Sequence, residues 1–253
     1  MDFFFWRKIR SSDKNDNTLL CTLTDDKKEI LNRNILNFFQ NSQLSNKQAL
    51  FVNTIAAVNF SLLNKNPKQP AIVTFVSSDD KNAGVDVNTL VIKLSEIINS
   101  NFCPIGSPPS FLAKSKTPPK EQKQQPTLDD NLKNVSNNFD LTDRDDTTNP
   151  TTFRDNIINR LANNATVVLT NLQKTPNQKS NVFTLQAVTD NFNAPFKQRI
   201  IFFTLLCSQF KSTMTQKQLF EIADECIKTT FSLVTDDQSS ALFSRLGEFV
   251  YFG

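Results

Sequence analysis

Apolar residues recur at helical spacing in the first part of the chain. Between Glu29 and Phe39 they fall three or four positions apart, which predicts a helix. A second helix is predicted to begin at the capping box Ser45-Asn46-Lys47-Gln48 and to end before Pro67, whose ring holds the preceding residue extended. The same spacing predicts a third helix over 89–99.

A short β-branched segment stands between the second and third helices. Ala71-Ile72-Val73-Thr74-Phe75-Val76 is typical of a strand, and Asp79-Asp80-Lys81-Asn82 predicts a turn after it. Val85-Asp86-Val87 is then predicted to pair back against the strand. Because a two-stranded ribbon is marginal by itself, we expect this β-hairpin to lean on the helices.

Helical spacing returns in the second half of the chain. One amphipathic helix is predicted after Pro150, and another is predicted to open at Pro195, which suits the first position of a helix. Two further helices are predicted to start at the capping boxes Thr215-Gln216-Lys217-Gln218 and Thr235-Asp236-Asp237-Gln238. The apolar positions that these four helices should bury include Phe153, Ile157, Leu161, Val168, Leu172, Phe202, Leu205, Leu206, Phe210, Ala223, Ile227, Leu246, Phe249 and Val250.

Taken together, these elements predict a mainly α fold: a helical-bundle core with a small β-hairpin, a long Pro-rich insertion and extended N- and C-terminal arms. Six of the eleven prolines lie between Pro104 and Pro126, which is typical of an extended, solvated linker. The predicted organisation is an N-terminal arm (1–26), the N-terminal half of the core (27–101), a disordered or loop insertion (102–148), the C-terminal half of the core (149–212) and C-terminal helices or arm (213–253).

The composition argues against most enzyme classes. The chain has no histidine, which removes Ser-His-Asp triads, Cys-His pairs and imidazole metal sites. It has only four glycines, so it cannot build a Gly-rich phosphate loop. We therefore predict no catalytic residue, no metal, no cofactor and no small-molecule substrate.

The cysteines and the apolar runs bear on location. Cys21, Cys103, Cys207 and Cys226 lack C-x-x-C spacing, and no signal peptide is recognisable, so the thiols are predicted to be reduced and the protein cytosolic. The apolar stretch Ile200 to Cys207 is far shorter than the roughly 20 residues that a membrane span needs. No membrane partner is predicted.

Four aromatic residues stand at the N-terminus: Phe3, Phe4, Phe5 and Trp6. One interpretation is an assembly arm that docks on another chain, because exposed aromatics are an aggregation hazard on a monomer. The other is that they fold back onto the core of their own chain. The sequence leaves both interpretations open.

The order of elements and two short motifs resemble a known family. A helix, a capped helix ending at Asn66-Pro67, a strand and a helix are followed by Asn149-Pro150-Thr151-Thr152-Phe153-Arg154-Asp155 and later by Val188-Thr189-Asp190-Asn191-Phe192. This order is similar to that of coat proteins of flexible filamentous plant viruses, the potyvirus, closterovirus and flexivirus group. The resemblance implies a helical core with a groove for single-stranded RNA, arms that link subunits into a helical filament, and a location in the virion and the host cell cytoplasm.

The resemblance also implies an RNA site. Arg154 follows a Pro-Thr helix start, Asp190 precedes an aromatic residue in the family's motif, and Asn66 stands where the family has a serine before proline. Arginine suits sequence-independent packaging because its planar fork makes two bonds to one phosphate. Lys197 and Arg199 are further phosphate candidates. Without the resemblance, Arg154 is an ordinary first-turn arginine, Asp190 a turn or capping acid, and the basic pair a solvated face.

The charge balance fits a polymer better than a lone nucleic-acid-binding domain. With 28 basic and 25 acidic residues the net charge is only +3, so each subunit can neutralise few phosphates. Many weak contacts along one RNA strand would still add up to tight binding. The alternatives are a viral nucleoprotein or minor capsid component, and a non-enzymatic helical adaptor that acts by binding other proteins.

Overall fold

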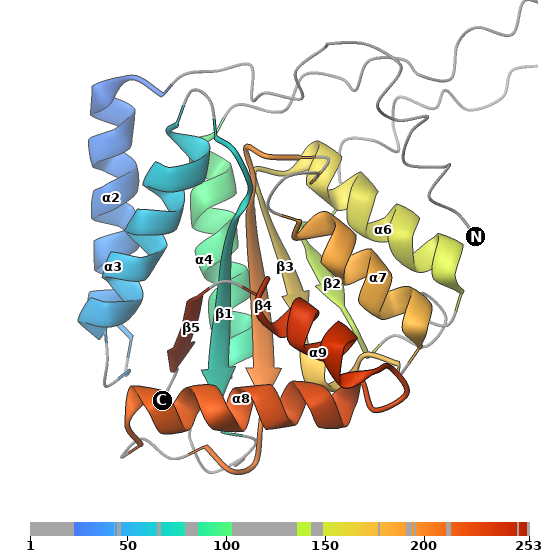
Figure 1. Ribbon diagram of the computed structural model, residues 1–253. Coiled ribbons are helices and arrows are strands. Elements are labelled where there is room, and N and C mark those ends of the chain that lie inside the picture. Colours follow the sequence, from blue (N-terminus) through green and yellow to red (C-terminus); the bar gives the residue numbers. More distant parts are fainter. Residues whose placement is uncertain are drawn as a thin grey trace, which may run out of the picture.

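The computed structural model describes residues 23–42, 44, 47–64, 67–78, 86–102, 136–142, 149–176, 178–190, 194, 196–210, 214–246 and 248–251. Within these residues the chain forms an α/β fold with a five-stranded sheet in the order β2-β3-β4-β1-β5 (Figure 1). The prediction of a mainly α helical bundle is therefore wrong. Most of the strands lie in the second half of the chain, mainly in segments that the sequence pattern predicted to be helical.

All the strand pairs in this sheet are parallel. The strands are β1 (Ala71–Ser77), β2 (Asn138–Asp140), β3 (Thr166–Thr170), β4 (Ile200–Leu206) and β5 (Glu248–Tyr251). β1 and β4 are buried along almost their whole length and pair residue for residue from Ala71 with Ile200 to Ser77 with Leu206. Continuous apolar runs of this kind are typical of parallel strands that are covered on both faces.

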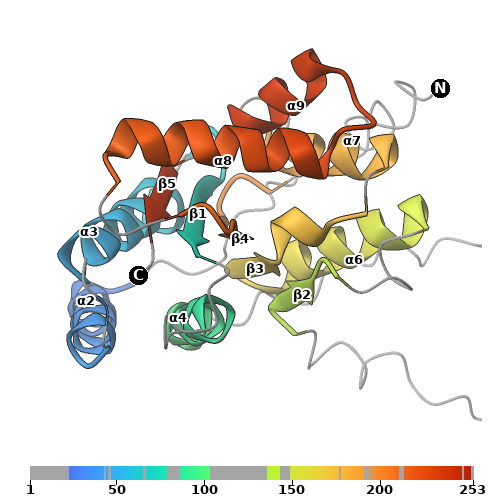
Figure 2. The ribbon, with the colours of Figure 1, turned by 90° about the horizontal axis from the view of Figure 1, so that it is seen from below.

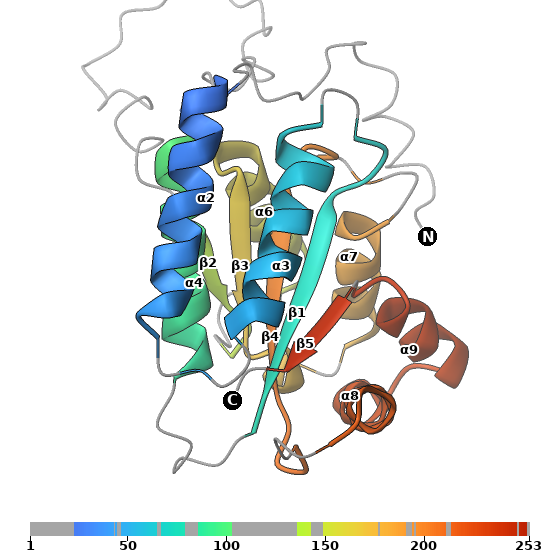
Figure 3. The ribbon, with the colours of Figure 1, turned by 90° about the vertical axis from the view of Figure 1, so that its left-hand side faces the viewer.

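The direction in which the chain crosses the sheet explains which helices cover each face. The N-terminal helices α2 (Asp25–Gln40) and α3 (Lys47–Ala57), with the π-helical turn η1 (Val58–Leu62), share one face with α4 (Val87–Asn101), which connects β1 to β2 (Figure 3). Later connections run the opposite way across the sheet. Because parallel crossovers are right-handed, their helices must lie on the other face. These are α6 (Pro150–Asn163), α7 (Lys179–Val188), α8 (Gln216–Thr230) and α9 (Asp236–Phe243), with a short 3-10 turn η3 (Leu172–Lys174).

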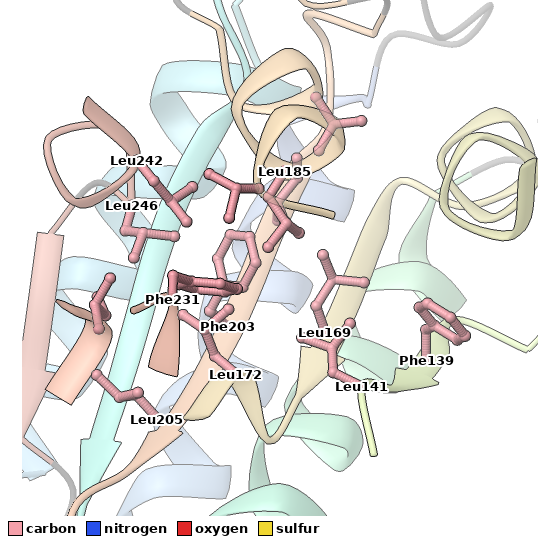
Figure 4. Packing of buried hydrophobic residues seen from close by; sticks show 14 of the residues in the cluster. Phe139, Leu141, Leu169, Leu172, Leu185, Phe203, Leu205, Phe231, Leu242 and Leu246 are labelled. Atoms are coloured by element: carbon pink, nitrogen blue, oxygen red, sulfur yellow. The ribbon is translucent and has the colours of Figure 1, made fainter. Parts of the chain in front are cut away.

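The sheet divides the hydrophobic core in two. Along β4, Ile200 and Phe202 pack toward α2–α4, whereas Ile201, Phe203 and Leu205 pack toward α6–α9. This alternation follows from the two-residue period of a strand. Figure 4 shows the second cluster, in which Leu185 of α7 and Leu242 of α9 belong to the same group of buried side chains as Phe203 of β4.

Several predicted elements are confirmed and others are wrong. The helices around Glu29–Phe39 and 89–99, the strand at β1 and the helix after Thr215 are present. The β-hairpin is wrong: Asp86 and Val87 do not pair with β1, because Asp86 caps α4 and Val87 begins it.

Of the two long helices predicted after Pro150 and Pro195, the first is shorter than predicted and the second is absent. The first ends at Asn163 and is followed by β3, and the second segment forms β4. The last predicted helix ends at Phe243, and β5 follows it.

The predicted domain boundaries cut across this fold. Strand β2 lies inside the predicted insertion 102–148, and buried Leu23, from the predicted N-terminal arm, belongs to the core. None of the helices in the described ranges is long and apolar enough to cross a membrane.

Candidate functional site

The carboxyl ends of the strands form the edge at which α/β proteins usually place their sites. The helices that follow β1 and β4 lie on opposite faces of the sheet, so the two connections diverge between these neighbouring strands. Such a switch point normally opens a crevice for a ligand. Figure 2 looks at this edge from below, with α4 on one side and α8 on the other.

A closed ring of hydrogen bonds joins three elements at this edge. The Asn88 amide of α4 donates to Asn171 Oδ1 over 3.0 Å, and the Asn171 backbone N–H donates to Thr204 Oγ1 over 2.9 Å. The Thr204 hydroxyl donates in turn to Asn88 Oδ1 over 2.6 Å. Asn171 follows β3 with a φ of 61°, in the left-handed region that asparagine tolerates better than most residues. The ring therefore ties α4, the end of β3 and the middle of β4 together.

A carboxylate extends this network to β2. The Asn171 amide donates to Asp140 Oδ1 over 2.9 Å, and the Thr142 backbone N–H donates to the same atom over 3.0 Å. Burial alone would raise the pKa of Asp140, but these hydrogen bonds and the nearby Lys174 charge lower its pKa below the ordinary value. The carboxyl group is therefore ionised at neutral pH and has no proton to give to a substrate.

The amino end of α4 faces the same edge, and the chain's own acid caps it. The Asp86 side chain accepts from the Asn88 backbone N–H over 3.0 Å and from the Thr89 hydroxyl. A helix N-terminus following a parallel strand is a common anion site, because its free N–H groups point at the ligand. Here a carboxylate takes one of those N–H groups and places a negative charge where a phosphate would sit. The sequence from Ser77 to Asp86 has a single glycine, Gly84.

Helix α8 is fastened to this edge by a disulfide. Cys207, directly after β4, is bonded to Cys226 of α8, so the prediction of reduced thiols is wrong for this pair. Cys21 and Cys103 lie outside the described residues. The Thr230 hydroxyl of α8 donates to the Gln173 carbonyl over 3.3 Å, and Gln173 Oε1 accepts from the Leu206 backbone N–H over 3.0 Å. These bonds hold α8 beside the ends of β3 and β4.

No protein-family model and no curated protein matches this sequence.

The described residues also offer no metal centre, since no three His, Cys, Asp or Glu side chains among them are grouped as ligands. The polar groups of the ring are neutral amides and hydroxyls that bond to one another, and the ring is joined to the Asp140 carboxylate. Such an arrangement stabilises a fixed geometry. It offers neither a nucleophile with an adjacent base nor a free anion cradle.

Arg199, predicted as a phosphate contact, lies inside the protein. Its side chain is almost wholly buried, with Nε donating to the Leu161 carbonyl over 2.7 Å and Nη1 donating to the Gln198 carbonyl over 2.8 Å. The guanidinium also stacks over the Phe196 ring, 5.6 Å from its centre. Burial lowers the pKa of Arg199 to about 10, so the group remains charged at neutral pH. Its bonds are made to the protein's own backbone, and RNA cannot reach it in this structure.

Arg154 and Asp190, the pair implied by the resemblance, come from neighbouring helices. Arg154 is half-buried in the first turns of α6, which starts at the carboxyl edge of the sheet. Asp190 follows the end of α7, where the chain has returned to the amino edge to begin β4. Asp190 Oδ2 lies 3.8 Å from Nη2 of Arg245, just before β5. The topology therefore places these two residues toward opposite edges of the sheet.

The remaining predicted residues give no assembled site. Lys197 is exposed, in the segment that leads into β4. Asn66 and the predicted assembly arm Phe3, Phe4, Phe5 and Trp6 lie outside the described residues. Sequence reasoning did not find the ring of Asn88, Asn171 and Thr204. Its one visible signal is an asparagine directly after the apolar segment Thr166–Thr170, a position that favours a polar strand end.

The ring gives a first testable prediction. Asn171→Ala removes the side-chain hydrogen bonds to Asn88 and Asp140 and leaves the left-handed backbone with a residue that tolerates it less well than asparagine. We expect a loss of about 2 kcal/mol in the free energy of unfolding, measured by urea denaturation. Asn171→Gly is the matched control, because it loses the same bonds but relieves the backbone. An alanine variant as stable as wild type would show that the ring does not hold the strand ends.

Proposed function

We propose that the chain is a non-catalytic α/β domain that acts by binding a partner protein. One observation carries the proposal: at the switch point, the anion position of α4 is capped by Asp86, and the adjacent polar groups bond to one another. A ligand-binding α/β protein needs these same groups to be free for its substrate. The absence of histidine and the scarcity of glycine in the sequence point the same way.

The partner surface that we favour is the outer side of α8 and the turn after it. Leu233 in that turn is 75% exposed. Phe220 in the first turns of α8 is 38% exposed, and one side of its ring packs against Phe243 and Phe249. Lys217, Glu221, Asp224 and Lys228 form a charged stripe along α8, in which Lys217 pairs with Glu221 and Lys228 with Asp224. Protein interfaces commonly combine exposed apolar side chains with charged residues beside them.

Ligand binding gives the first test of this proposal. ATP or NAD at millimolar concentration with Mg²⁺ should leave the melting temperature unchanged. A ligand at 100 times its Kd would add about 2.7 kcal/mol and raise the Tm by roughly 5–10 °C in a domain of this size. A saturable Tm increase of that order would refute the proposal that the edge is closed to nucleotides.

Partner binding gives the second test. Wild type, Leu233→Asp and Val52→Asp are each cross-linked to their partners in the source cells. Val52→Asp is the control, because Val52 is an exposed apolar residue on α3, away from the favoured surface. We expect Leu233→Asp to lose a partner that wild type and Val52→Asp both retain. Identical partner sets for all three proteins would contradict the proposed surface.

RNA packaging by a coat protein, with a place in the virion or the host cytoplasm, stays a prediction from the sequence resemblance. Negative-stain images of the full chain with single-stranded RNA test it directly. Filaments or rings that depend on RNA would support the coat-protein prediction. A dispersed protein that does not retain RNA would leave the interaction domain as the better proposal.

A further inference from the structure

The chain contains three Asn-x-Ser/Thr sequences in which x is not proline, the acceptor motif for N-linked oligosaccharides. They are Asn59-Phe60-Ser61, Asn134-Val135-Ser136 and Asn164-Ala165-Thr166. The motif is short, and an asparagine-rich chain acquires copies by chance, so the sequence alone does not separate used sites from unused ones. Asn134 lies outside the described residues, whereas the structure describes the other two.

Asn59 and Asn164 differ in their surroundings. Asn59 is exposed on η1, at the outer side of the α2–α4 layer. Asn164 is half-buried where α6 turns into β3, and its Nδ2 donates to the Arg160 carbonyl over 3.1 Å. An oligosaccharide is bulky and must remain in solvent after folding. Only the first of these two asparagines meets that requirement.

The other residues of the Asn59 motif agree with attachment before folding. Ser61 is fully buried in the folded protein, and its hydroxyl donates to the Arg199 carbonyl over 2.6 Å. An enzyme that recognises this hydroxyl must therefore act while the chain is still unfolded. Phe60, beside Asn59, is 46% exposed and offers apolar surface that an attached sugar ring can cover.

The disulfide supplies an independent argument about the compartment. Disulfides such as Cys207–Cys226 persist in oxidising compartments and are rare in the cytosol. In eukaryotes the oxidising compartment in which chains fold is also the one that attaches N-linked oligosaccharides.

We propose that Asn59 carries an N-linked oligosaccharide, acquired as the chain folds in the secretory pathway. In the transfer, C1 of the first sugar forms a bond to Asn59 Nδ2, which loses one proton. The bond from C1 to the pyrophosphate of a lipid-linked donor breaks, and the lipid pyrophosphate leaves. The proposal does not depend on the proposed function, because the argument uses neither α8 nor the strand ends.

The first measurement uses the full chain isolated from its source cells. Digestion with peptide-N-glycosidase in ¹⁸O water converts a glycosylated asparagine to labelled aspartate, which peptide mass spectrometry assigns to a position. We expect complete labelling at Asn59 and none at Asn164, together with a Cys207–Cys226 linkage in the peptide map made without reduction. Unlabelled Asn59 together with free thiols at Cys207 and Cys226 would overturn the proposal and favour the predicted cytosolic location.

Matched variants test the acceptor itself. The full chain is sent into the endoplasmic reticulum behind a cleavable leader, and its mobility is compared before and after deglycosylation. Asn59→Gln should remove one mobility step, whereas Ser61→Thr, which keeps the motif and the buried hydroxyl, should retain it. Asn164→Gln should change nothing. If wild type enters the compartment, forms its disulfide and still shows no step at Asn59, the proposal is wrong.

Discussion

Arg199→Ala is expected to lower the free energy of unfolding by about 3–5 kcal/mol, the largest loss that we predict for any single substitution. The guanidinium satisfies the carbonyls of Leu161 and Gln198 in the buried layer where α6 ends and β4 begins. Alanine leaves both carbonyls without this donor and opens a cavity beside Phe196. Each buried polar group that loses its partner costs about 1–3 kcal/mol before the cavity is counted.

The backbone carbonyl of Arg199 connects further elements to the same point. Its carbonyl accepts from the Ser61 hydroxyl over 2.6 Å and from the Ala71 backbone N–H over 3.0 Å. The residue therefore lies where η1, the start of β1, the start of β4 and the end of α6 meet. Loss of packing at this point should loosen both layers of helices.

Urea denaturation followed by circular dichroism measures the effect. Lys197→Ala is the control, because Lys197 is an exposed basic residue two positions away and its replacement should change stability by less than about 0.5 kcal/mol. Equal urea midpoints for Arg199→Ala and Lys197→Ala would show that the hydrogen bonds of the Arg199 side chain contribute little to stability. If Arg199→Ala does not accumulate as folded protein, Arg199→Lys provides the measurement, since it keeps the charge and loses the planar fork.

Arg199 should not make stability depend on pH near neutrality. Burial lowers its pKa from the ordinary value of an exposed arginine to about 10 in the folded protein, so the side chain is charged in both states at neutral pH. Above pH 10 the folded state releases its proton first and the unfolded state binds more protons. The contribution of Arg199 to stability therefore rises with pH in that window and is flat below it.

The sequence pattern predicted individual helices better than it predicted the sheet. Helix α8 has a clear capping box at Thr215 and a strong 3.6-residue apolar period, and both signals are local. Strand β4 is an unbroken apolar run, Ile200–Leu206, and such a run is compatible with either a buried helix or a buried strand. What makes it a strand is pairing with β1, more than a hundred residues earlier in the chain. No local period records that pairing.

The candidate site was missed for a related reason. Asn88, Asn171 and Thr204 lie far apart in the sequence, and each is unremarkable in its own segment. They meet because parallel strands and the helix after β1 converge at one edge. Arg199 shows the opposite problem: as a basic residue of a predicted amphipathic helix it was expected at the surface, but it directly precedes the central strand β4 and its side chain is buried.

Loss of the disulfide is expected to produce the second large effect. Cys207 and Cys226 are 19 residues apart, and closing a loop of that length stabilises the folded state by about 3 kcal/mol in the chain-entropy account. The double variant Cys207→Ser, Cys226→Ser should therefore melt roughly 6–12 °C below wild type. Calorimetry without a reductant measures the difference.

The structure also predicts which helix is destabilised when the disulfide is absent. The buried face of α8, with Ala223, Ile227 and Phe231, belongs to the second core cluster, and the disulfide fixes this face against the end of β4. Amide hydrogen exchange should therefore accelerate in α8 when the bond is absent. It should stay unchanged in α2, which packs on the other face of the sheet.

A dithiol reductant supplies the control for the disulfide prediction, because it reaches the same state without a mutation. Reduced wild type should melt at the temperature of the double variant, and the reductant should not alter the double variant further. Cys226 is the half-buried partner and Cys207 the buried one, so attack should begin at Cys226 Sγ. A wild-type protein whose melting temperature and α8 exchange do not respond to reduction would contradict the disulfide as the fastening of α8. In that case the core packing of α8 and the hydrogen bonds that Gln173 makes with Thr230 and Leu206 would be enough to hold the helix.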